Sequence, residues 1–166
     1  MHKSAYVANS FLYKAKSEGV NNMDQLKVQK LVYCLHGWHL AVYGTPAVGE
    51  FFEAWKFGPV LSSLYDQFKM YGSGNIDSFA VALDPISGEP KALYIGDLHP
   101  NFHSILEPVW NRYKHLTGLQ LSALTHAPGT PWSIARAAGE SYITNEAIRL
   151  EFVELAKKSR VEQNVG

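Results

Sequence analysis

Residues 26–40 read LKVQKLVYCLHGWHL, and after one turn residues 52–60 read FEAWKFGPV. On a helix with 100° per residue, the first stretch carries apolar side chains on both sides, with Leu31 on one and Leu26 on the other. A helix that is apolar all round is surrounded by other elements. The sequence therefore predicts a buried helix over residues 23–43 at the centre of the fold.

A few polar residues stand inside this apolar pattern. Gln29 and Lys30 lie within the central helix, and a lysine buried without a partner costs several kcal/mol. We hypothesise that Lys30 pairs with Glu53 across a helix–strand contact, with the charged groups within about 4 Å. The alternative is an exposed recognition patch that includes Lys56. Gly37, on the same side of the helix as Lys30, would let another backbone approach closely.

Apolar spacing, capping residues and prolines predict further helices around the central one. They cover residues 4–17, 59–71, 100–117, 119–126, 131–138 and a last helix capped by Thr144. Pro59 is expected in the first turn of its helix, after a sharp turn at Gly58. Pro108 removes a backbone hydrogen bond, which predicts a kink or two short helices that meet near Glu107.

Two segments predict β-structure. Residues 51–57 carry aromatic side chains at both parities, as in an extended segment packed on two sides. Residues 73–96 hold short β-prone runs between glycines and aspartates, which favours a hairpin or loop excursion and a place for partner contacts. The expected fold class is mainly α: a compact helical domain with a central buried helix and a small β-hairpin excursion.

Composition limits the classes of protein to consider. A chain of 166 residues with 46% hydrophobic content can bury a sizeable core, so we expect one domain over residues 1–166. Its single cysteine, Cys34, fits a reducing cytosol and is expected to be a buried structural thiol. No signal region or run of about 18 apolar residues occurs, so we expect a cytoplasmic protein without membrane contact. Fifteen basic and fifteen acidic residues give no net field toward nucleic acid.

The search for a catalytic or metal site finds little. His36 and His39 could share an ion on one helix, but a zinc site needs three or four ligands. No nucleophile elbow, phosphate-binding loop or His-Glu-x-x-His helix occurs. We therefore expect no cofactor, no metal and no enzymatic activity. His126 stands at a predicted helix C-terminus, where a polar clasp between two helices is favoured over a ligand contact.

Several separated motifs resemble, in order, the Panacea (SocA-like) antitoxin domain of bacterial and phage toxin–antitoxin systems. They are Gln-Lys-Leu-x-Tyr at 29–33, Gly-Trp-His at 37–39, Glu-Ala-Trp-x-x-Gly-Pro-Val at 53–60, and Leu-x-x-Leu-Thr-His at 121–126 with a following Pro-Trp. The resemblance assigns a signature scaffold to Leu31, Tyr33, Gly37, Trp38, Trp55, Gly58, Pro59 and Trp132. Val28 departs from the pattern, because the family has leucine before the glutamine.

The resemblance implies an antitoxin that neutralises a cognate toxin by direct contact, the toxin being encoded by the adjacent gene. An alternative within the family is an adaptor that delivers the toxin to a Clp-type protease, and a homodimer is a further candidate assembly. A DNA-binding repressor would need a basic recognition helix that the chain lacks, and a metal-dependent hydrolase ranks lower still. The candidate partner-binding or clasp residues are Gln29, Lys30, Glu53, Lys56 and His126.

The tryptophans of the signature have two interpretations. Trp38, Trp55 and Trp132 are more often core residues, because large aromatic side chains supply much of a small protein's buried surface. An aromatic residue left partly exposed beside Lys56 and Phe57 would instead be an anchor for a partner.

Overall fold

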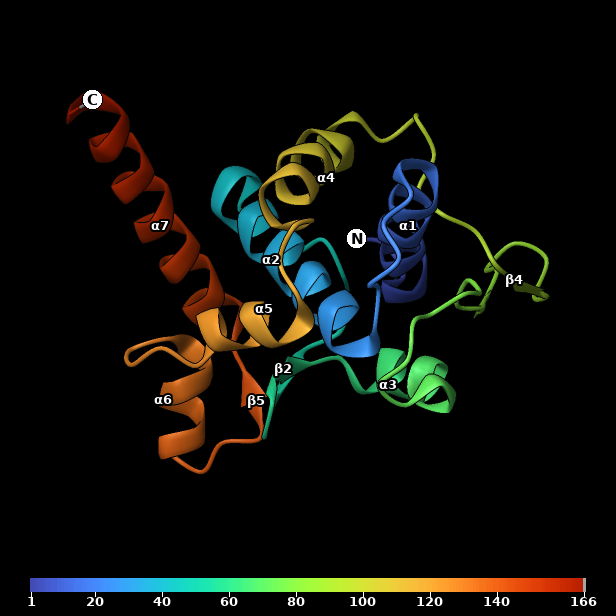
Figure 1. The fold of residues 1–166 in the computed structure, drawn as a ribbon, viewed down its shortest axis with the longest axis horizontal. Coiled ribbons are helices and arrows are strands. Elements are labelled where there is room, and N and C mark those ends of the chain that lie inside the picture. Colours follow the sequence, from blue (N-terminus) through green and yellow to red (C-terminus); the bar gives the residue numbers. More distant parts are fainter. Residues whose placement is uncertain (166) are drawn as a thin grey trace.

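Helices make up most of the structure, a computed structural model that describes the backbone of residues 1–165 and the side chains of residues 1–160. The mainly α prediction is confirmed (Figure 1). The helices are α1 (Ser4–Glu18), α2 (Gln25–Tyr43), α3 (Ser62–Phe68), α4 (Pro100–Tyr113), α5 (Gly118–Thr125), α6 (Pro131–Ala137) and α7 (Asn145–Val165), with a 3-10 turn η1 (Lys69–Tyr71) after α3. No helix within the described residues is long and apolar enough to cross a membrane.

The strands are short and form two antiparallel sheets. They are β1 (Phe52–Trp55), β2 (Gly58–Val60), β3 (Ala82–Leu83), β4 (Pro90–Lys91) and β5 (Tyr142–Ile143). The order β2-β1-β5 makes one sheet, in which Trp55 pairs with Gly58 across a two-residue turn and Phe52 pairs with Ile143. The second sheet is the β3–β4 hairpin of the excursion. The two strands of the excursion are shorter than the β-prone runs of the sequence.

Helix α2 lies at the centre of the fold, as its pattern predicts (Figure 1). It packs against α1, α3, α4, α5 and α7. The Asp24 side chain accepts a hydrogen bond from Lys27 N at 2.8 Å and caps its start. Gly44, with a φ of 69°, ends it in the left-handed conformation that glycine adopts without strain. Because α2 is covered on all sides, it orients every element that contacts it.

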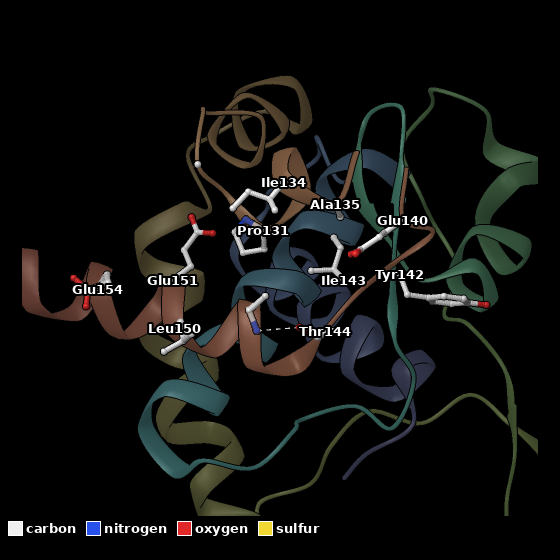
Figure 2. A pocket seen from close by; sticks show the side chains of 12 residues that line it. Pro131, Ile134, Ala135, Glu140, Tyr142, Ile143, Thr144, Leu150, Glu151 and Glu154 are labelled. Carbon is white, nitrogen blue, oxygen red and sulfur yellow. Dashed lines mark hydrogen bonds between the residues drawn. The ribbon is translucent and has the colours of Figure 1, made fainter. Parts of the chain in front are cut away.

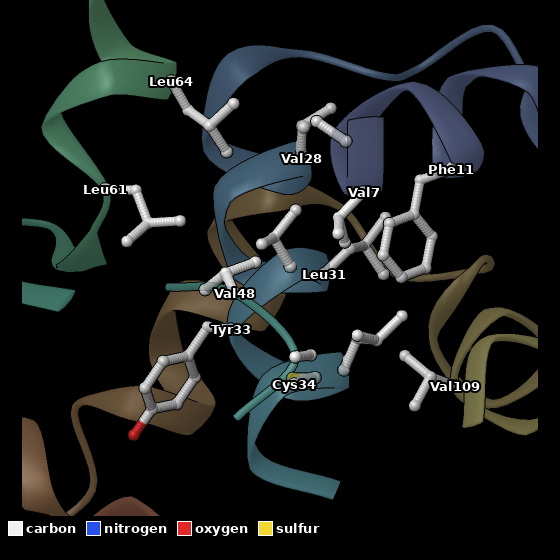
Figure 3. Packing of buried hydrophobic residues seen from close by; sticks show 14 of the residues in the cluster. Val7, Phe11, Val28, Leu31, Tyr33, Cys34, Val48, Leu61, Leu64 and Val109 are labelled. Atoms are coloured by element: carbon white, nitrogen blue, oxygen red, sulfur yellow. The ribbon is translucent and has the colours of Figure 1, made fainter. Parts of the chain in front are cut away.

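The core is built on the apolar positions of α2 (Figure 3). Val28 and Leu31 lie between Val7 and Phe11 of α1 on one side and Leu61 and Leu64 on the other, and Cys34 belongs to the same cluster further along α2. Burial raises the pKa of the Cys34 thiol to about 12, so the thiolate needed for reactivity does not form at neutral pH. Cys34 is a buried structural thiol, as predicted.

Gly37 provides a close approach between α2 and α7. A Cβ atom at this position would lie 2.2 Å from the Phe152 ring of α7. The neighbour is therefore an aromatic side chain and not the backbone that the sequence predicts. Phe152 also packs edge-on against Tyr33 and Trp38, at centroid distances of 5.9 and 5.3 Å. Tyr33 is buried, whereas Trp38 is only partly buried, with the Arg112 guanidinium 5.7 Å from its ring.

The prediction for Pro59 is wrong, and so is one of the two alternatives at Pro108, that of two short helices. Pro59 lies in β2, opposite Ala54, and α3 begins only at Ser62. Proline fixes a φ that suits both a helix start and an edge strand, so local sequence does not separate the two. The helix around Pro108 is one helix and not two. Pro108 and Ser104 both line an open hollow between α2 and α4, where water can reach the carbonyl that proline leaves unpaired.

Asn9 of α1 holds the excursion against the helical body. Its side-chain amide donates to Ala80 O at 2.8 Å and to Leu93 O at 2.7 Å, and its oxygen accepts from Ala80 N at 2.7 Å. Asn9 is fully buried. The excursion is therefore fixed at its base, while residues at its tip such as Ile86 are exposed.

Gly37→Ala is expected to destabilise the protein by about 1–3 kcal/mol, because the added methyl group overpacks the contact with the Phe152 ring. Urea unfolding measures the effect. Gly96→Ala is the control, since a Cβ there meets nothing within 4 Å, and it should change stability by less than about 0.5 kcal/mol. Adding Phe152→Leu to Gly37→Ala should restore part of the loss. Equal stability of both glycine variants would contradict the packing described.

A pH profile tests the buried imidazole of His36. Its Nε2 lies 2.9 Å from Asn145 Oδ1, and its Nδ1 accepts from Val48 N at 3.4 Å, so the neutral ring fits the site. Burial lowers its pKa from 6.5 to about 4. On acidification, His36 is protonated in the unfolded chain before it is protonated in the folded one. The free energy of unfolding therefore keeps its full value above about pH 6.5. It falls by about 3 kcal/mol for this residue as the pH drops toward 4.

The measurement is urea unfolding of the wild type and His36→Gln at pH 7 and pH 4. His36→Gln should lose less stability on acidification than the wild type, and His115→Gln, at an exposed position, should follow the wild type. Identical acid dependence in all three proteins would show that His36 does not titrate as described.

Candidate functional site

The turn between β1 and β2 is held by side chains from three helices. Five backbone carbonyls of this hairpin each accept a hydrogen bond from a side chain of α2, α5, α6 or the residue that ends α5. The pairs are Arg136 Nη1 to Ala54 O (3.2 Å), Trp132 Nε1 to Trp55 O (2.7 Å), His126 Nε2 to Lys56 O (3.2 Å), Ser122 Oγ to Phe57 O (2.6 Å) and Lys30 Nζ to Pro59 O (2.9 Å). These bonds fix the hairpin in one position.

Lys30 does not pair with Glu53, so this hypothesis is wrong. Its ammonium is buried and donates to the Pro59 carbonyl, and no ion pair in the described part of the chain joins it to a carboxylate. The Glu53 carboxylate accepts from Trp55 Nε1 at 2.6 Å. Side chains alternate along a strand, and β1 buries Phe52 and Ala54 while Glu53 and Trp55 face the other way. The carbonyl of β2 is therefore the partner within reach of Lys30.

Gly58 makes room for Lys30. Its φ of 114° lies in the region that favours glycine. A Cβ atom at this position would lie 2.5 Å from Lys30 Cε and 2.8 Å from Thr125 Oγ1. Burial lowers the pKa of the Lys30 ammonium to about 7. The Gly-Pro pair of the signature thus follows from the buried lysine beside it.

Gln29 binds the end of the same hairpin. Its side-chain nitrogen donates to Leu61 O and its oxygen accepts from Leu61 N, both at 3.0 Å. Gln29 is buried, and both of its polar atoms are used within the chain. Together with Lys30, it positions β2 and the start of α3 and leaves no polar atom on the surface.

His126 ends α5 and contacts the turn. Its Nδ1 lies 2.6 Å from Ser122 O and its Nε2 3.2 Å from Lys56 O. Its ring lies against Trp132, with a centroid distance of 3.8 Å. The side chain therefore connects α5 and α6 with the hairpin turn, whereas the sequence predicts a clasp between two helices alone.

A groove opens beside this hairpin, and we call it the signature groove. Its volume is about 680 Å³. It is lined by Asp24, Gln25, Leu26 and Gln29 of the α2 region, Trp55, Lys56, Phe57 and Val60 of the hairpin, and Tyr65, Gly72, Ser73 and Leu119. Leu119 is 73% exposed and Phe57 60% exposed, so apolar side chains stand open to solvent. Trp55 packs edge-on against Tyr65 at 5.0 Å.

Two polar groups of the groove are free to bind a partner. Lys56 is exposed, with its ammonium 5.5 Å from the Phe57 ring centre, and it is in none of the ion pairs formed among the described residues. The Gln25 Oε1 atom is buried and has no hydrogen-bond partner. A buried acceptor without a donor carries a free-energy cost that an incoming N–H or O–H group would remove.

The histidines do not form a metal site. In the part of the chain that the structure describes, no three His, Cys, Asp or Glu side chains are placed to hold a metal ion. His36 binds Asn145, and His39 Nδ1 lies 2.7 Å from Thr45 O, so the two rings of this pair have separate partners.

Ser122 and Arg136 hold the hairpin but are not among the residues that the sequence singles out. One signal for Ser122 was present, because it stands four residues before His126 and therefore on the same face of α5. Arg136 has no such signal. It reaches Ala54 O only because β5 and α6 bring the chain back beside β1.

Lys30→Met tests the buried ammonium. The folded-state pKa is about 7 and the ordinary value 10.5, so between these the unfolded chain holds the extra proton and wild-type stability rises with pH. The variant should lack this rise. Between pH 7.5 and 9.5, the slope of its urea unfolding free energy against pH should be lower than that of the wild type by about 1 kcal/mol per pH unit. Lys157→Met, at an exposed position, is the control. Parallel curves for Lys30→Met and the wild type would contradict a buried titrating lysine.

Comparisons with known proteins agree with this geometry. The family model described as "Antitoxin SocA-like, Panacea domain" matches residues 28–133, which include most of α2, the hairpin, α5 and Trp132. The curated protein Antitoxin SocA of Caulobacter vibrioides is 36% identical over 158 residues, covering 93% of this chain and 79% of that protein. No solved structure matches the chain. The family match covers more than half of the chain, and the chain belongs to the SocA-like Panacea antitoxin family.

Proposed function

We propose that this antitoxin-family protein neutralises a cognate protein toxin by direct contact, and that the signature groove is the contact surface. The observation that carries the proposal is the exposure of Phe57 and Leu119 beside a turn in which the carbonyls of residues 55–57 each accept a hydrogen bond from a side chain of the chain itself. Apolar and aromatic side chains that stay exposed in a hollow are typical of protein-binding surfaces.

The rigidity of the hairpin supports binding. Phe57 is carried on a two-residue turn whose neighbouring carbonyls accept from Trp132, His126 and Ser122. Ordering a loop on association costs free energy, and a turn already held in place avoids that cost. In this proposal Gln29 and Lys30 position the surface, and Lys56 contacts the toxin directly.

The family supplies the expected partner. The curated relative is named as an antitoxin, and we extend that role to this chain. We propose that residues 1–166 act as one antitoxin domain in the cytoplasm, without enzymatic activity, on a toxin encoded by the adjacent gene. If the protein instead delivers the toxin to a protease, the toxin level falls after capture. If it only blocks the toxin, the level stays constant.

Co-expression with the product of the adjacent gene tests the proposal. The wild type should restore growth and co-purify with that product. Phe57→Ala and Leu119→Ala should each weaken the complex at least about tenfold, the effect of losing one binding hot spot. Both side chains are largely exposed, so neither change should lower the melting temperature by more than a few degrees.

Leu98→Ala is the matched control, because Leu98 is 93% exposed and lies outside the groove. It should bind like the wild type. If the wild type binds the toxin and the groove variants bind it equally well, the contact surface is elsewhere. If the wild type neither rescues growth nor captures the product, neutralisation of that product is excluded.

A further inference from the structure

A second hollow lies between α6, β5 and α7, and we call it the acidic pocket (Figure 2). It has a volume of about 370 Å³ and shares no lining residue with the signature groove. Apolar side chains form most of its wall, from Pro131, Ile134, Ala135, Ile143, Ala147 and Leu150. Three carboxylates, those of Glu140, Glu151 and Glu154, complete it.

Glu151 is the unusual member of this lining. Figure 2 shows its carboxylate directed from α7 toward Pro131 and Ile134 of α6. Its Oε2 atom is buried and has no hydrogen-bond partner. Burial raises the pKa of this carboxyl group, and the charge of Lys158 offsets the rise in part. An acceptor that is buried and unpaired costs free energy, which a donor entering the pocket would recover.

Three carboxylates against two lysines leave the pocket negative, since Lys158 acts on Glu151 and Lys157 on Glu154. Glu154 pairs with Lys157 at 3.2 Å, where both side chains are exposed and the pair is weak. Glu140 is in no ion pair within the described chain. A cationic group is therefore the complement that the pocket lacks.

The rim of the pocket is apolar. Ile134, Tyr142 and Leu150 are 60%, 57% and 51% exposed. Apolar walls around a carboxylate suit a guanidinium better than an ammonium, because the guanidinium is planar, weakly hydrated and able to donate two parallel hydrogen bonds. The methylene groups of the same side chain can lie along the apolar rim.

We propose that the acidic pocket receives an arginine side chain of a partner protein, with its guanidinium donating to the Glu151 carboxylate. Charge complementarity and the unpaired buried oxygen identify this occupant. The pocket is a docking site separate from the signature groove, so it stands or fails independently of toxin binding there.

The test uses N-acetyl-arginine amide as the probe and NMR of the methyl groups of Ala135, Ala147 and Ile143. The probe should shift these signals saturably, and the neutral isostere N-acetyl-citrulline amide should bind at least tenfold more weakly. Glu151→Gln should also weaken the arginine probe at least tenfold. Its melting temperature at pH 7 should not fall, because a carboxylate with a raised pKa disfavours the folded state once ionised.

Glu146→Gln is the control, since Glu146 lies in the first turn of α7, pairs with Arg149 and does not line the pocket. It should bind the probe like the wild type. The assignment would be overturned if the citrulline probe or N-acetyl-lysine amide bound as tightly as the arginine probe. It would also be overturned if Glu151→Gln bound the arginine probe as tightly as the wild type. A concentration-dependent dimer that Glu151→Gln dissociates would also overturn it, because the occupant would then be a second copy of the chain.

Discussion

The hydrogen bond from the buried Lys30 ammonium to the Pro59 carbonyl is the contact on which the surface of this protein depends. It joins the central helix to a hairpin that is too short to be stable alone. The cost of burying the ammonium appears in its lowered pKa, and Gly58 is the residue that leaves space for it. The Gln29 contact with Leu61 then extends the attachment to the start of α3. Gln29 and Lys30 are therefore directed inward, whereas Lys56 of the same signature is exposed.

In this arrangement, the residues that support the surface differ from the residues that are exposed on it. Lys30 and Gln29 are buried and bind the chain's own backbone, whereas Phe57 is presented to solvent by the turn that they support. The signature stretch therefore supplies both the support and the exposed aromatic group of one surface. Substitution of a supporting residue changes stability and surface together, and substitution of Phe57 changes the surface alone.

The sequence predicts the elements that depend on local patterns. The central helix follows from apolar residues all round α2, and the excursion over residues 73–96 follows from its glycines and aspartates. What it does not predict depends on contacts between distant segments. Pro59 is compatible with a helix or a strand, and contacts with distant residues, the pairing with Ala54 and the bond from Lys30, place it in a strand. The two-residue strand β5 has no pattern of its own and exists because Ile143 pairs with Phe52.

Strand β1 connects the two candidate docking surfaces, because it pairs with β2 beside the signature groove and with β5 beside the acidic pocket. Their spacing is therefore set by backbone hydrogen bonds and not by a loop. Each has a charged side chain of a different sign at hand for a partner, Lys56 at the groove and Glu151 in the pocket. A partner that covers both needs an acidic group facing one and an arginine facing the other, at a fixed distance. Such a pattern selects the orientation of a partner more than it adds affinity.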